Sequence, residues 1–145
     1  MNMLLRLRRL SLLLSAVLLW ASCGGDDSTV GPDGSDGAGQ LTEATLAQVS
    51  EVFAVSCAFS GCHSGGDPAA GLSLEGDFAA RIVGVASEQR SGFLLVDPGN
   101  PNKSYLLLKV RGDDEIISQR MPPGNPLPAE QVEIIRAWIA SGAKE

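Results

Sequence analysis

The sequence predicts one small helical domain that follows an N-terminal export signal. The chain has 145 residues, which leaves room for a single core once a targeting segment is removed. Apolar residues recur at helical spacing shortly after residue 41 and again shortly before the C-terminus. A proline-rich loop over 118–128 separates the closing helix from the rest. Residues 41–145 are therefore the expected domain.

The first 22 residues have the order of a secretory signal. Three arginines precede an apolar run over 10–20, and Ala21 and Ser22 then stand before Cys23. The run is shorter than the roughly 20 residues that a membrane-spanning helix needs, which favours cleavage over a transmembrane anchor. Residues 19–23, Leu-Trp-Ala-Ser-Cys, resemble a bacterial lipoprotein signal. This resemblance implies that Cys23 becomes a lipidated N-terminus at the periplasmic face of a membrane or at the cell surface.

Residues 23–40 are expected to comprise the lipidated Cys23 and a flexible tether that follows it. Positions 24–40 read GGDDSTVGPDGSDGAGQ and cannot bury enough apolar surface to fold. Removal of residues 1–22 takes away three arginines and no acidic residue, so the formal charge changes from −6 to −9. This balance argues against nucleic acid as a partner, because phosphate binding depends on clustered basic residues.

The helices follow from spacing and end signals. A first helix, capped by Thr42 and running to about Val55, places four apolar residues on one face: Leu46, Val49, Val52 and Phe53. Residues 77–83 suit a short helix and 93–96 an extended segment. A third helix is expected to begin at Pro101 and to end before Gly112. Its expected members include Tyr105, Leu106, Leu108 and Lys109.

The closing helix has the clearest pattern. It is expected to open at Pro128, after a stiff loop that also contains Pro122, Pro123 and Pro126. Gly142 stands where a left-handed cap would end it. The residues at helical spacing are Val132, Ile135, Trp138 and Ile139.

The candidate chemistry lies in the segment from Cys57 to His63. Once Cys23 is assigned to lipid, Cys57 and Cys62 are the remaining cysteines, and His63 is the only histidine. The usual haem c attachment is Cys-x-x-Cys-His, with two thioether bonds and a proximal imidazole ligand. Here four residues separate the cysteines, but Cys62 and His63 remain adjacent. A Cys57–Cys62 disulfide is one alternative, although it leaves His63 unexplained. A zinc site is another, although no second Cys or His cluster completes it.

Met121 is the candidate distal ligand. Met1 and Met3 leave with the signal, so Met121 is the only methionine of the mature chain. A thioether is a suitable sixth ligand for haem iron when no second histidine exists. The alternative is that Met121 fills a gap in the core. Its place in the proline-rich loop, rather than on an amphipathic helix, favours the ligand.

Together, the Cys57–His63 segment, the Met121-Pro122 loop and the closing helix through Gly142 resemble class I cytochrome c domains over roughly 41–143. The closest likeness is to the Cys-x4-Cys-His variety of exported bacterial proteins. The resemblance implies an all-α fold in which the first and last helices cross and a single covalent haem c lies between His63 and Met121. Cys57 and Cys62 would supply the thioethers. Phe53 and Trp138 match aromatic positions near the crossing.

The expected function is transfer of single electrons outside the cytoplasm. With both axial positions held by protein, no small-molecule substrate is expected to reach the iron. The expected partners are a redox protein or membrane oxidoreductase, with the lipid anchor holding the chain to a membrane. A cofactor-free structural or interaction lipoprotein with a Cys57–Cys62 disulfide is the main alternative. A peroxidase whose Met121 dissociates is the weaker one.

Overall fold

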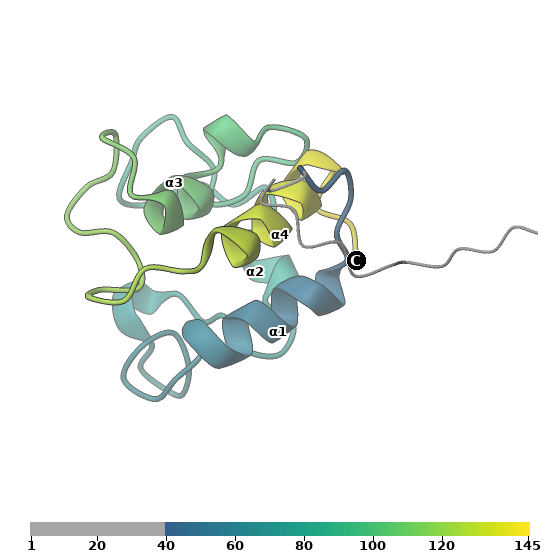
Figure 1. The fold of residues 1–145 in the computed structure, drawn as a ribbon. Helices are drawn as coiled ribbons and strands as arrows, with labels where there is room; N and C mark the ends of the chain where they lie inside the picture. Colours follow the sequence, from purple (N-terminus) through teal and green to yellow (C-terminus); the bar gives the residue numbers. More distant parts are fainter. Residues whose placement is uncertain (1–39) are drawn as a thin grey trace, which may run out of the picture. The chain divides into compact units, whose positions relative to one another are not determined.

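The computed structural model describes residues 40–145, so the signal, Cys23 and the linker up to residue 39 lie outside the described residues. Figure 1 shows a helical domain. Its elements are α1 (Leu46–Ser56), a 3₁₀ turn η1 (Ala69–Gly71), α2 (Ala79–Ile82), a second 3₁₀ turn η2 (Pro101–Lys103), α3 (Tyr105–Arg111) and α4 (Ala129–Ala140). Residues 40–145 contain isolated β-bridges but no strand. The expected all-α fold is confirmed.

The N-cap of the first helix lies three residues later than expected. Thr45, not Thr42, caps α1 in an extended backbone conformation. The Thr45 hydroxyl accepts from the Gln48 amide at 3.3 Å, and the Gln48 side chain accepts from the Thr45 amide at 2.9 Å. This reciprocal capping box satisfies two amides that the helix leaves free. The expectation for Thr42 was wrong because only Thr45 has a glutamine three residues downstream.

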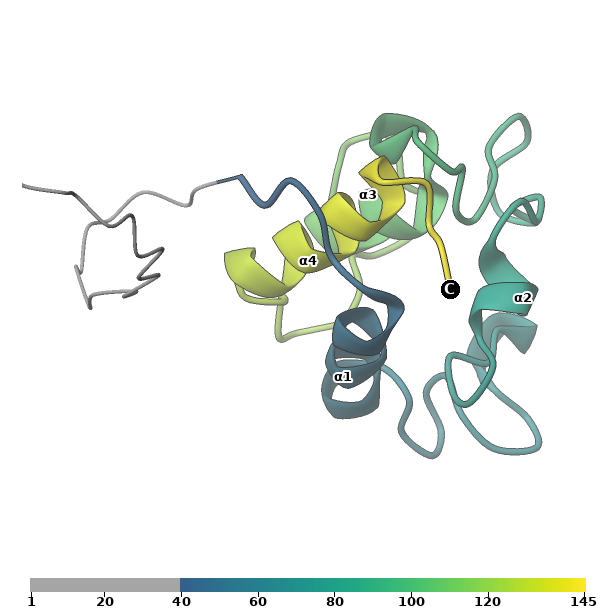
Figure 2. The ribbon, with the colours of Figure 1, turned by 90° about the vertical axis from the view of Figure 1, so that its right-hand side faces the viewer.

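The first and last helices are in contact, as expected. In Figures 1 and 2, α4 packs against both α1 and α3. Phe53 of α1 and Trp138 of α4 are each 1% exposed, and the Phe78 ring contacts both. Its centroid lies 4.9 Å from that of Phe53 and 6.3 Å from that of Trp138, in edge-to-face geometry. These aromatic side chains form the centre of the core.

The third helix is shorter than its pattern predicts. Ser104 has an extended conformation and separates η2 from α3, so a continuous helix from Pro101 is wrong. The Ser104 hydroxyl accepts from the Asp97 amide at 2.8 Å, and the Tyr105 amide donates to the Leu94 carbonyl at 2.9 Å. These tertiary hydrogen bonds replace helical ones. The other end was predicted correctly, because Gly112 has a φ of +76° and terminates α3.

The loop expected over 118–128 is irregular and belongs to a longer irregular stretch over 112–128, and α4 follows with Pro128 as its N-cap. Gly142 has a φ of +102°, which an L-residue rarely adopts, just after the helix ends. Among residues 40–145, no helix combines the length and apolar character that crossing a membrane would require.

Candidate haem site

The C-terminus of α1 positions Cys57 and His63. Cys57 is the C-cap, and its amide donates to the Phe53 carbonyl at 2.8 Å. The chain then turns back, so the His63 amide donates to the Cys57 carbonyl at 3.1 Å. Gly61 lies within this turn at a φ of +80°, in the left-handed region that favours glycine. The four residues between the cysteines therefore form a compact turn.

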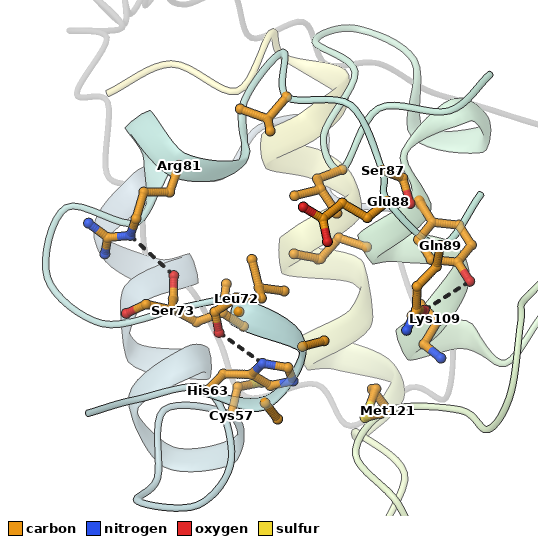
Figure 3. Close-up of a pocket in the computed structure, with 18 of the residues that line it drawn as sticks. Cys57, His63, Leu72, Ser73, Arg81, Ser87, Glu88, Gln89, Lys109 and Met121 are labelled. Atoms are coloured by element: carbon orange, nitrogen blue, oxygen red, sulfur yellow. Dashed lines mark hydrogen bonds between the residues drawn. The ribbon is translucent and has the colours of Figure 1, made fainter. Parts of the chain in front are cut away.

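One ring nitrogen of His63 has a hydrogen-bond partner in the backbone. Its Nδ1 lies 3.0 Å from the Leu72 carbonyl oxygen. A carbonyl can only accept, so Nδ1 is the donor, and in the neutral imidazole this arrangement leaves the lone pair on Nε2. Figure 3 shows this second ring nitrogen on the side of the pocket where Met121 lies. A backbone carbonyl that fixes the distant nitrogen is a common arrangement for histidine bound to a metal.

The two cysteines differ in environment. Cys57 is buried, Cys62 is exposed, and both are free thiols. Burial, followed by the nearby Cys62, raises the pKa of Cys57 to about 11. The Cys57 thiol is therefore protonated at neutral pH. Cys57 lines the pocket, whereas Cys62 is not among its lining residues and borders it only through its neighbour His63.

Met121 reaches the same pocket from the loop between α3 and α4. Its amide donates to the Lys109 carbonyl of α3 at 2.9 Å, and its side chain is half-buried. Met121, His63 and Cys57 all line one cavity of about 280 Å³. Figure 3 places His63 and Met121 at the same end of this cavity. The structure thus brings three of the four expected haem residues to one pocket, with Cys62 beside it.

The rest of the pocket is largely apolar and has a polar end. Its hydrophobic wall includes the side chains of Phe53, Leu72, Leu74, Leu95 and Leu106. Ser87, Glu88 and Gln89 lie toward the end away from His63 (Figure 3). A flat apolar cofactor with polar substituents at one edge suits such a lining. Within 40–145, no group of three His, Cys, Asp or Glu side chains is placed so that it could hold a metal ion.

Comparison with protein families adds a second, independent observation. Residues 60–125 match the family model of Planctomycete cytochrome C. The part of the chain that matches this family model contains Cys62, His63 and Met121, and it ends before α4. Comparison with curated proteins and with solved structures gives no significant match.

Some pocket residues had no sequence signal. The Leu72 carbonyl that orients His63 belongs to the backbone, which carries no residue signature. The polar end at 87–89 lies in a segment without clear periodicity. Lys109 was expected only as a helix residue, yet it is buried and lines the pocket. A lysine among the apolar residues of Tyr-Leu-Leu-Leu-Lys-Val was the one available hint.

Proposed function

We propose that residues 41–145 carry one haem c and pass single electrons between redox partners outside the cytoplasm. Cys57 and Cys62 would hold the haem through thioether bonds, with His63 as the proximal and Met121 as the distal ligand. The observation that carries the proposal is the pocket that Cys57 and His63 share with Met121, a residue distant from both in the sequence. The match of 60–125 to a cytochrome c family implies haem-based electron transfer.

The side chains present fit this cofactor. Imidazole and thioether are the axial donors of His/Met cytochromes, and bound haem iron supplies one-electron chemistry. Hydrogen bonding to Leu72 leaves the Nε2 lone pair of His63 available as a donor. With haem bound, the apolar wall would exclude water and so would favour the less charged, reduced iron. His63 and Met121, as the two ligands, would close the iron to substrates, and such a site would suit a carrier rather than an enzyme.

The lipid anchor belongs to the same proposal. Cys23 would carry the acyl chains and residues 24–40 would tether the domain, which would keep it near a membrane-bound oxidoreductase or another redox protein. A seventeen-residue flexible chain has an end-to-end distance on the order of 20–25 Å. That distance would hold the domain clear of the lipid headgroups.

A potentiometric titration of the purified protein tests the carrier function. The visible haem spectrum is expected to change reversibly with a slope of about 59 mV per tenfold change in the ratio of oxidised to reduced protein, the value for one electron. A Cys57→Ala/Cys62→Ala double variant is the control and is expected to lose the covalently bound chromophore. A wild-type protein with no reversible haem signal, or one that turns over peroxide rapidly, would contradict the electron-carrier assignment.

A further inference from the structure

Lys109 is an unusual residue within α3. The helix is buried from Tyr105 to Val110, and Lys109 is only 8% exposed. Among residues 40–145, no carboxylate forms an ion pair with it. A buried ammonium without a countercharge requires strong hydrogen-bond acceptors. Hydrophobic packing alone therefore does not explain why a lysine occupies this buried position.

The acceptors of the Lys109 ammonium lie in the loop that leads to Met121. Its Nζ donates to the Ile117 carbonyl at 2.9 Å and to the Gln119 carbonyl at 2.7 Å. Ser118, between these two residues, has a φ of +65°, which is rare for a residue other than glycine. The loop thus turns around the ammonium in a backbone conformation that its sequence does not favour by itself.

The backbone of Lys109 fixes the same loop at a third point. Its carbonyl accepts from the Met121 amide at 2.9 Å. One residue of α3 therefore contacts positions 117, 119 and 121, while its own side chain lines the pocket together with Met121. Figure 3 shows Lys109 on the Met121 side of that pocket.

Two neighbouring contacts hold the loop against the same helix. The Arg120 Nε donates to the Val110 carbonyl at 2.8 Å, and the Ile117 amide donates to the Tyr105 hydroxyl at 2.9 Å. Neither involves a charge within the pocket. Lys109 differs because it supplies two charge-assisted hydrogen bonds to the loop from a buried position in the pocket lining, whereas the Arg120 guanidinium supplies one from outside that lining.

We propose that Lys109 is a positioning residue for the distal ligand. Its ammonium, by binding the carbonyls of Ile117 and Gln119, keeps the loop in the conformation that presents the Met121 thioether to the haem pocket. The inference rests on the proposed function, because it takes Met121 as the iron ligand. Lys109 itself is not a ligand and acts only through the loop.

Carbon monoxide binding to the reduced holoprotein measures how readily Met121 leaves the iron. Lys109→Met keeps the length and apolar stem but removes both hydrogen bonds to the loop carbonyls. It is expected to bind carbon monoxide about 10- to 100-fold faster than wild type, the same range by which loss of a group that orients a metal ligand lowers metal affinity or activity. Lys109→Arg retains the charge and the donors, and is expected to bind more slowly than Lys109→Met. Lys144→Met, an exposed lysine with the same charge change, is expected to match wild type.

Met121→Ala separates the two ways in which this experiment can fail. If Met121→Ala binds carbon monoxide no faster than wild type, Met121 is not the ligand, and the proposed ligation fails together with the role of Lys109. If Met121→Ala binds fast while Lys109→Met matches wild type, only the role of Lys109 is overturned. Should Lys109→Met not fold with haem, Lys109→Gln replaces it, and a wild-type rate in that variant overturns the proposal.

Discussion

Replacing Trp138 with alanine is expected to lower the free energy of unfolding of the holoprotein by about 3–5 kcal/mol, the usual cost of emptying a large buried aromatic site. The indole is 1% exposed, and its Nε1 donates to the Lys144 carbonyl at 2.8 Å. The substitution removes the contact with Phe78 that links α4 to α1 through the core. Urea denaturation followed by circular dichroism gives the difference directly.

A matched control distinguishes core packing from a general effect of removing apolar groups from helices. Val55 is in α1 and is 63% exposed. Val55→Ala is expected to change the free energy of unfolding by less than about 0.5 kcal/mol, as exposed substitutions usually do. If wild type and Trp138→Ala have equal free energies of unfolding, the contact between α1 and α4 does not stabilise the domain in the way described.

Met121→Ala is expected to leave the haem attached through Cys57 and Cys62 while it opens the sixth coordination position. Thioether ligation favours ferrous iron, so its loss should lower the reduction potential and admit carbon monoxide or peroxide. Slower electron transfer and slight peroxidase activity should follow. Spectroelectrochemistry with and without carbon monoxide measures both effects in one sample.

The control for Met121→Ala lies in the same loop. Ile117 is 48% exposed, and Ile117→Ala keeps the backbone carbonyl that Lys109 binds. Its reduction potential and its indifference to carbon monoxide should match wild type. A Met121→Ala protein that shares those properties would make Met121 a packing residue and leave the distal position to another group.

The helices could be predicted from the sequence where side-chain periodicity decided the structure. In α4, Ile135, Trp138 and Ile139 recur at helical spacing and are all buried. The failures occurred where tertiary hydrogen bonds overrode local preference. Nothing at Ser104 interrupts the helical pattern, yet its hydroxyl bonds to the segment around Asp97 and the helix breaks.

The sequence could predict the part of the candidate site whose residues must be neighbours in the chain for haem attachment. Cys62 and His63 are neighbours, so their shared role can be proposed without a structure. The remaining parts depend on backbone atoms distant in sequence. The Leu72 carbonyl orients His63, and the carbonyls of Ile117 and Gln119 bind Lys109. Backbone acceptors look the same at every position, so only the folded chain shows which of them are used.

A haem stain of the exported protein on a denaturing gel, together with its intact mass, tests the central claim most directly. Covalent haem survives denaturation, so a stained band and a mass increased by one haem are predicted. Both should disappear in the Cys57→Ala/Cys62→Ala variant. An unstained wild-type band, with a mass that indicates a Cys57–Cys62 disulfide and no haem, would contradict the account.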